Sequence, residues 1–158
     1  MYKFIAFIFS ILLIGQISYA QNVQQNPVNL SVYSQEVEGF KSGMTDYQLT
    51  LQRGETGNCG KILASIIDMA EKEFNLTKKR HAWFQNFSCQ AIDTEKMAYH
   101  LKGRVTKQEE LLVGMQKISN KDVLDNASLN IASDYIQYFF ESMKENLEES
   151  QLIANQCN

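Results

Sequence analysis

Two histidines, His81 and His100, are the side chains that any imidazole-based chemistry in this chain would use. Nucleophilic catalysis needs a base within hydrogen-bond reach of a serine or cysteine, and a third group that orients the base. His81 follows a run of basic residues at an expected helix start. His100 lies near an expected helix end, where an imidazole can meet the terminal carbonyls. Neither lies in a glycine-flanked nucleophile turn, so we predict no catalytic residue.

The spacing of the potential metal ligands also matches no known metal-binding pattern. The chain contains no CxxC, HExxH or CxxCH pattern, and its three cysteines are far apart in sequence. Asp93, Glu95 and His100 are neighbours in sequence, but they do not share one helix face at four-residue spacing. The glycine-rich segment 54–60 lacks the GxxxxGK[ST] spacing that brings a lysine to bound phosphates. We therefore predict neither a metal nor a cofactor.

The cysteines Cys59, Cys89 and Cys157 are disulfide candidates if the chain enters an oxidising compartment. Two of them would pair and leave one thiol, for which burial is the simplest expectation. A disulfide requires Cα atoms within about 7 Å of each other. Cys59–Cys89 and Cys59–Cys157 are the favoured pairings, and helix continuity near Asp93 decides between them.

Residues 1–20 have the three parts of a cleavable signal peptide. Lys3 gives a positive start, residues 4–15 are apolar, and small residues precede a cut between Ala20 and Gln21. The apolar run is shorter than the 20 or so residues that a bilayer span needs. We therefore expect a periplasmic or secreted protein with no stable membrane anchor after cleavage.

The length and the net charge of the exported part limit its number of domains and its possible partners. Without residues 1–20 the chain keeps about 140 residues, which is enough for one core and too few for two. The net charge of −3 for the full chain becomes one unit more negative without Lys3. An acidic chain without a basic cluster gives no electrostatic reason to bind nucleic acid.

Helical periodicity dominates the mature chain. We expect a disordered mature N-terminus over 21–31, which contains Pro27, and a single helical domain over 32–158. A first helix ends near Gly54, and 54–60 forms a loop. A second helix begins near Asn58 or Cys59 and runs to about residue 75. Thr77 would cap a third helix, and Gly103 closes this region. Asp93 and Thr94 interrupt the apolar pattern before Gly103, so one long helix or two short ones are both possible. The buried stripe of the first helix is Tyr33, Val37, Phe40, Met44, Tyr47 and Leu51.

The C-terminal half predicts two further helices. Thr106 to Glu109 forms a capping box that would open a short helix. The last helix would start at Ser119 or Asn120. Its expected buried face is Leu124, Ala127, Ile131, Tyr135, Tyr138, Phe139, Met143 and Leu147. No alternating apolar pattern predicts strands, so the fold class is all-α, an antiparallel bundle of four to five helices.

The aromatic residues of the last helix allow three interpretations. They form plain core, line an apolar cavity between helices, or contribute to a partner interface. Phe140 points off the expected buried stripe, so it is the candidate for a partner surface.

Two resemblances bear on function. The segment from Leu76 to Arg80 resembles the LTxxQ motif of periplasmic helical stress chaperones, with Arg80 at the glutamine position. The resemblance implies a periplasmic helical chaperone. The general format of a signal peptide, a small acidic helical domain and few cysteines is similar to periplasmic immunity proteins.

Together these features predict an exported, non-enzymatic binding protein that acts on a protein partner through a helical surface, as an inhibitor or immunity-type protein does. A secreted helical carrier of a small apolar ligand is the first alternative. A periplasmic helical chaperone is the second.

Overall fold

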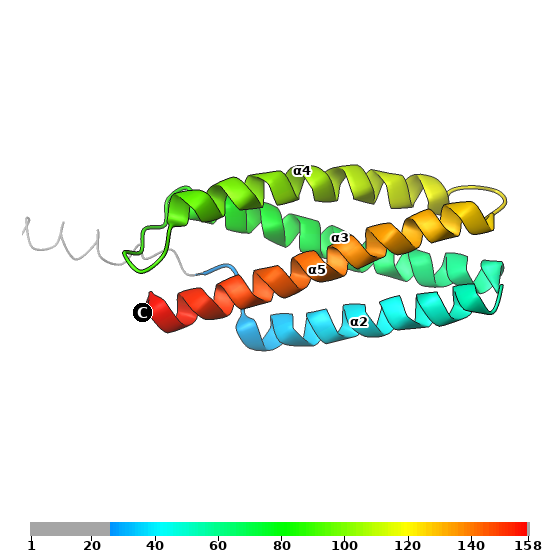
Figure 1. Ribbon diagram of the computed structural model, residues 1–158, viewed down its shortest axis with the longest axis horizontal. Coiled ribbons are helices and arrows are strands. Elements are labelled where there is room, and N and C mark those ends of the chain that lie inside the picture. The colour runs from blue at the N-terminus through cyan, green and yellow to red at the C-terminus, as the bar shows by residue number, and fades with distance from the viewer. Residues whose placement is uncertain (1–25, 158) are drawn as a thin grey trace, which may run out of the picture.

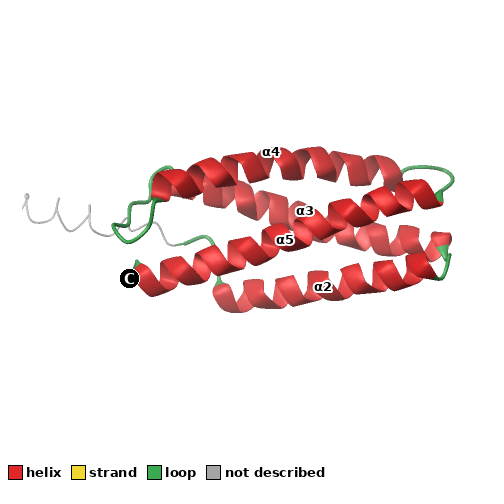
Figure 2. Cartoon of the chain, in the orientation of Figure 1, coloured by secondary structure: helices red, strands yellow, loops and turns green. Residues whose placement is uncertain are grey.

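The computed structural model describes residues 26–157, and every regular element in this part of the chain is an α-helix. Four helices follow in order: α2 (Leu30–Gln52), α3 (Thr56–Phe84), α4 (Thr94–Ser119) and α5 (Asn126–Gln156). Figures 1 and 2 show one elongated bundle in which each helix runs back along the one before it. The expected all-α class is therefore confirmed for the described residues. The predicted signal peptide and its cut at Ala20 lie outside them.

Local sequence explains where the helices begin and end. The side chains of Asn29, Asp93 and Asp125 cap α2, α4 and α5 by accepting a hydrogen bond from a backbone N–H in the first turn. Gly54, at φ +73°, provides the left-handed residue that follows α2. The short α2–α3 turn and the α4–α5 loop lie at one end of the bundle (Figure 1). The α3–α4 loop and the C-terminus lie at the other.

Several predicted helix boundaries are wrong because tertiary contacts override local signals. Thr77 does not cap a helix, because α3 continues through it, and α4 likewise continues through Gly103. Thr106 does not form a capping box, since its hydroxyl donates to the carbonyl of Lys102 at 3.2 Å within α4. The last helix starts after Asp125 instead of near Asn120.

Two segments outside the helices are also shorter than expected. The predicted loop over 54–60 closes within three residues, because α3 already begins at Thr56. At the N-terminal side α2 begins at Leu30, inside the segment predicted to be disordered, and Val28 is buried against the main core.

The buried face of α5 differs from the predicted stripe. Ala127 is exposed and Ile131 is 46% exposed, whereas Leu129, Ala132 and Ile136 are buried. The prediction assigned Leu124 to the same stripe, but Leu124 precedes the helix and only partly packs against the core. The buried face of α5 also includes polar residues, among them Ser128, Ser142 and Asn146, so a stripe drawn through apolar residues alone is rotated away from it.

The buried apolar residues form two clusters along the bundle. The main core contains residues of all four helices, including Phe40, Leu63, Met115 and Phe139. The end cluster lies near the α3–α4 loop. It contains Trp83, Phe84, Leu101 and Ile153, with Phe87, Ile92, Met97, Ala98 and Cys157 packed against them.

The disulfide joins Cys89 to Cys157, with a Cα–Cα distance of 5.7 Å. Both favoured pairings, Cys59–Cys89 and Cys59–Cys157, are therefore wrong. Cys59 lies in the first turn of α3, at the other end of the bundle, and is a buried free cysteine in the main core. Because α3 ends at Phe84, the loop that follows carries Cys89 to the end where α5 finishes.

We expect a digest of the unreduced protein to yield one linked pair of peptides, containing Cys89 and Cys157. Reduction should cost about 2–5 kcal/mol of unfolding free energy, because the bridge closes a loop with a sequence separation of 68. Urea unfolding with and without reductant measures this cost, and the Cys59→Ala variant, which keeps the bridge, is the control. A linked peptide that contains Cys59 would contradict the structure.

Candidate functional site

A layer of polar side chains separates the main core from the end cluster, and all four helices contribute to it. We call this set the polar layer; most of its members are buried. It consists of Tyr33 from α2, Glu73, Thr77 and Arg80 from α3, Arg104 and Gln108 from α4, and Ser142, Asn146 and Glu149 from α5. On α3 the layer follows Ala70 of the main core and precedes Trp83 of the end cluster.

Asn146 is the centre of the polar layer. Its amide oxygen accepts from the guanidinium groups of Arg80 and Arg104. Its amide nitrogen donates to Glu73 Oε1 and, at 3.1 Å, to Thr77 Oγ1. A side-chain amide offers two donors and two lone pairs, so every hydrogen-bonding position of Asn146 is occupied.

Glu73 lies beneath the surface with three donors around it. Its Oε2 accepts from the Tyr33 hydroxyl at 2.6 Å, and its Oε1 accepts from Thr77 at 3.1 Å and from Asn146. Burial raises the pKa of the Glu73 carboxyl, and the hydrogen bonds from Tyr33, Asn146 and Thr77 only partly offset this effect. Burial also raises the pKa of the Tyr33 phenol, and the neighbouring Glu73 charge raises it further.

Two arginines share one carboxylate on the other side of Asn146. Arg80 is fully buried, and its Nη2 lies 3.1 Å from Glu149 Oε2. Arg104 binds Glu149 through both Nη atoms, at 2.8 and 3.3 Å, and also pairs with Glu145 at 3.0 Å. Burial lowers the pKa of Arg80 against the opposing effect of Glu149. For Arg104, burial is the largest single effect and lowers the pKa, but Glu149 and Glu145 together with Tyr138 outweigh it, so the pKa is raised.

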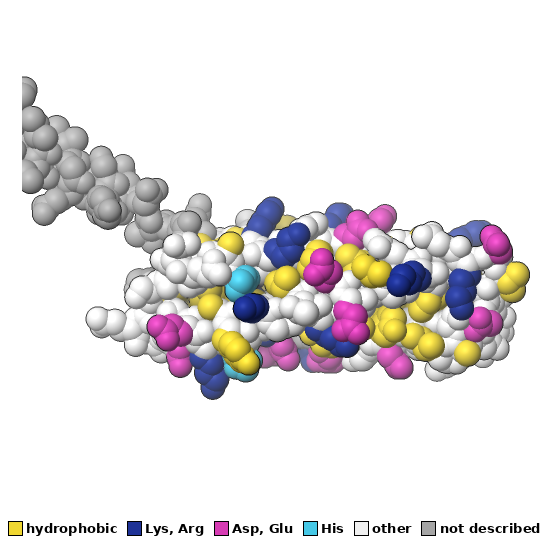
Figure 3. All heavy atoms as spheres, turned by 90° about the horizontal axis from the view of Figure 1, so that it is seen from above, with side chains coloured by type: hydrophobic (Ala, Val, Ile, Leu, Met, Phe, Trp, Pro, Cys, Tyr) yellow, Lys and Arg dark blue, Asp and Glu magenta, His cyan; other side chains and the backbone are white. Residues whose placement is uncertain are grey.

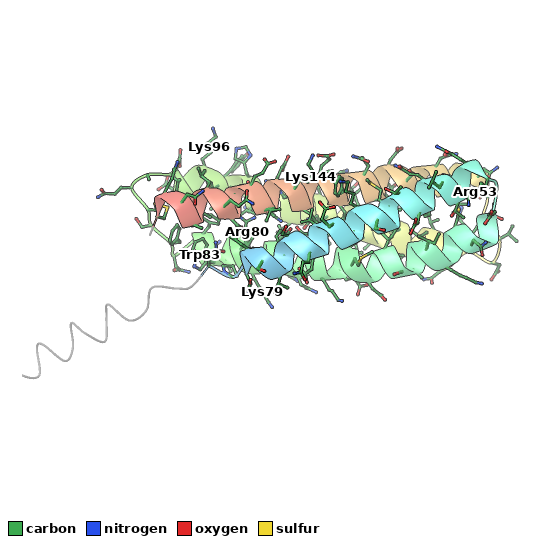
Figure 4. The ribbon with its side chains drawn as sticks, turned by 90° about the horizontal axis from the view of Figure 1, so that it is seen from below. Arg53, Lys79, Arg80, Trp83, Lys96 and Lys144 are labelled. Carbon is green, nitrogen blue, oxygen red and sulfur yellow. A yellow bond between two sulfur atoms is a disulfide. The ribbon has the colours of Figure 1, made fainter. Side chains whose placement is uncertain are left out.

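The polar layer forms part of the floor of a surface groove between α2 and α3. The groove has a volume of about 500 Å³, and buried residues of three helices, Tyr33, Glu73 and Met143, lie at its base. Figure 4 views the bundle from the side on which α2 and α3 lie next to each other, with Lys79 and Arg80 at the same level of the bundle. The other lining residues are Glu36, Gly39, Met69, Lys72, Asn75, Leu76 and Lys79.

The groove is open above Gly39, where a Cβ atom would meet no other heavy atom within 4 Å. One turn further along α2, a Cβ at Gly43 would lie 3.2 Å from Met69 Cε. The two glycines therefore differ in role, because Gly43 allows close packing of α2 on α3 while Gly39 leaves part of the groove empty.

The residues singled out in the sequence do not gather at this groove. His81 is half-buried on α3, and His100 is exposed on α4 beside Tyr99. Phe140 is half-buried and packs against the main core, with Lys144 Nζ 5.6 Å from its ring centroid. Asp93 caps α4, and the part of the chain that the structure describes contains no group of three or more side chains that could hold a metal ion.

Sequence reasoning missed the polar layer, although a signal for it exists. Glu73, Thr77 and Arg80 continue the buried stripe of α3 at helical spacing, and Asn146 and Ser150 do the same on α5. A polar side chain at an inward position predicts a buried hydrogen-bonded group. Thr77 and Arg80 belong to the segment that resembles the LTxxQ motif, and here both are fully buried.

The face of the bundle drawn in Figure 3 carries no single dominant charge. Acidic and basic side chains are interspersed there with apolar ones. No helix of the described residues is long and apolar enough to cross a membrane. Comparisons with protein-family models, curated proteins and solved structures find no match for this chain.

Replacing Asn146 with leucine should cost about 3–5 kcal/mol of unfolding free energy, because Glu73, Arg80 and Arg104 lose a shared partner while they stay buried. Urea unfolding at neutral pH measures this loss. Asn155→Leu, at an exposed position of the same helix, is the matched control and should change stability by no more than about 0.5 kcal/mol. Similar stabilities for the two variants would show that the network does not hold the helices together.

The raised pKa of Glu73 makes stability depend on pH in a defined direction. Below the unfolded-state pKa of about 4.3 the carboxyl is protonated in both states, and its contribution is complete. As pH rises toward the folded-state pKa, the unfolded chain loses the proton first, so the unfolding free energy falls. Unfolding curves at a series of pH values should show this decline in the wild type and not in Glu73→Gln. Glu148→Gln controls for the loss of an exposed carboxylate. A decline retained in Glu73→Gln would refute the assignment to Glu73.

Proposed function

We propose that this chain is an exported, non-enzymatic binding protein that holds its partner in the groove between α2 and α3. The observation that carries the proposal is the groove itself, about 500 Å³ in volume, with buried residues of three helices at its base. This volume lies within the range of about 300–1,000 Å³ that is typical of ligand sites. The floor is held in place by hydrogen bonds of the polar layer, so the groove exists before a partner arrives.

The polar layer supports a binding role because the groups at its centre, Glu73, Thr77 and Asn146, are engaged with one another. Arg80 Nε and Gln108 Oε1 in the same layer are buried without a hydrogen-bond partner among the described residues. The Glu73 oxygens accept three hydrogen bonds, and Asn146 has no free hydrogen-bonding position. Proton transfer or nucleophilic attack would require one of these groups to leave its partners. The network therefore acts best as a rigid support, and the accessible chemistry is recognition at the groove.

Export is part of the proposal and rests on two features. Residues 1–20 have the pattern of a signal peptide. The Cys89–Cys157 disulfide is the kind of bond that persists in the periplasm or outside the cell, where thiols are not kept reduced.

An inhibitor or immunity-type role needs a protein partner that inserts an apolar side chain into the groove. The carrier alternative needs a small ligand, and the groove offers a place for it at the surface, between α2 and α3. The chaperone alternative gains less support. Two residues of its motif-like segment, Thr77 and Arg80, are buried and engaged in the polar layer.

Gly39→Leu should abolish binding at the groove without destabilising the protein. The new side chain meets no neighbour at its Cβ and fills part of the groove. Replacing a helical glycine should also raise stability by up to about 1 kcal/mol. The measurement is capture from envelope extract by immobilised protein, with bound proteins and small molecules both identified by mass spectrometry, alongside a thermal unfolding curve.

The matched control is Gly103→Leu on α4, where an exposed glycine also has no heavy atom within 4 Å of an added Cβ. We expect the wild type and Gly103→Leu to capture the same species and Gly39→Leu to lose it. Equal capture by all three proteins, or none by the wild type, would exclude the groove as the binding site.

A further inference from the structure

The floor of the groove suits a flexible apolar chain. Met69 and Leu76 of α3 are half-buried, and Met143 of α5 is buried beneath them. Methionine side chains adapt their shape readily because they are unbranched and polarisable. An elongated hydrocarbon chain can therefore lie along this floor without a fixed complementary shape.

Two lysines on α3 give the groove its charge. Lys72 and Lys79 both line it, and neither forms an ion pair within the described residues. They are separated by seven residues, or about 10.5 Å along the helix axis. Four other lysines each pair with an acid three or four residues away in the sequence: Lys41, Lys107, Lys121 and Lys144. Lysines elsewhere on the surface, such as Lys61 and Lys117, also form no ion pair within the described residues. Lys72 and Lys79 differ from them because they line the groove, where both are available to a ligand.

The opposite wall carries a charge of the other sign. Glu36 of α2 is exposed and lines the groove, and no ion pair of Glu36 occurs within residues 26–157. An anionic group in the groove is therefore attracted to the α3 side and repelled from the α2 side. This asymmetry places a single head group near Lys72 or Lys79, with the apolar remainder over the methionines.

We propose that the groove binds a single-chain anionic amphiphile, with its carboxylate or phosphate head on Lys72 or Lys79 and its apolar chain on Met69, Leu76 and Met143. The proposal rests on the assignment of the groove as the binding site and adds the chemical class of the ligand. A fatty acid and a single-chain phospholipid share this chemistry and differ in the head group.

Calorimetric titration of the purified protein with dodecanoate and with dodecyl phosphate, each below its micelle concentration, tests the proposal. Dodecanol is the neutral-head comparison. We expect both anions to bind at one site and dodecanol to bind at least about tenfold more weakly. Stronger binding of one anion would identify the preferred head group. Equal binding of the alcohol and the anions would overturn the proposal, as would the absence of anion binding.

Variants assign the contacts. Lys72→Gln and Lys79→Gln should weaken binding of the preferred anion, at least one of them by about three- to fivefold, and Glu36→Gln should strengthen it by about twofold. Lys61→Gln changes an exposed lysine of α3 that does not line the groove, so it should leave the affinity unchanged. Unchanged affinity in both groove lysine variants would overturn the placement of the head group.

The two proposals can fail separately. If no amphiphile binds but Gly39→Leu still loses a captured protein, the ligand class is wrong and the groove remains the binding site for a protein partner. If amphiphiles bind equally to the wild type and Gly39→Leu, they bind elsewhere and the proposed ligand of the groove is wrong. If Gly39→Leu changes no captured species either, the proposed function falls as well.

Discussion

The hydrogen bonds of Asn146 are the interaction on which the rest of the bundle depends. This one amide joins Glu73 and Thr77 of α3 to Arg80 of the same helix and Arg104 of α4, and Glu73 in turn holds Tyr33 of α2. An amide satisfies donors and acceptors at once, which neither a carboxylate nor an ammonium group can do. It can therefore lie between an acidic and a basic group in the interior and leave neither without a partner.

Such a layer limits how the four helices can slide past one another. Apolar contacts are non-directional, so a bundle held by them alone tolerates shifts along its axis. A shift of α5 would separate Asn146 from all its partners while they remained buried, and the desolvation cost would not be recovered. The polar layer thus specifies register, as a buried polar residue does in coiled coils. At the end of the bundle the Cys89–Cys157 bond adds a covalent constraint to the same alignment.

The groove is a consequence of the same arrangement. Tyr33 and Glu73 are held below the surface by their mutual hydrogen bond, and Gly39 has no side chain with which to fill the space between α2 and α3. Met143 closes the base from α5. A hollow supported by three helices can present an apolar floor beside two unpaired lysines, which is the combination that the proposed ligand class requires. The stability of the layer and the shape of the groove are thus linked through Glu73.

Periodic apolar spacing predicts the all-helical class and most of the inward stripe of α2, because it reports which side of a helix avoids water. At the end of that stripe Thr50 is buried, whereas Leu51 is half-buried. Local patterns failed where a competing tertiary interaction exists. Thr77 and Thr106 have the chemistry of caps, yet α3 and α4 continue through both, since packing over a full bundle outweighs a single local hydrogen bond. The pairing of Cys89 with Cys157 follows from the packing of the whole bundle, because it depends on where α3 ends and how far the next loop reaches. The sequence predicted neither the groove nor the polar layer. Both are formed by residues that lie far apart in sequence and meet only when the four helices share one register.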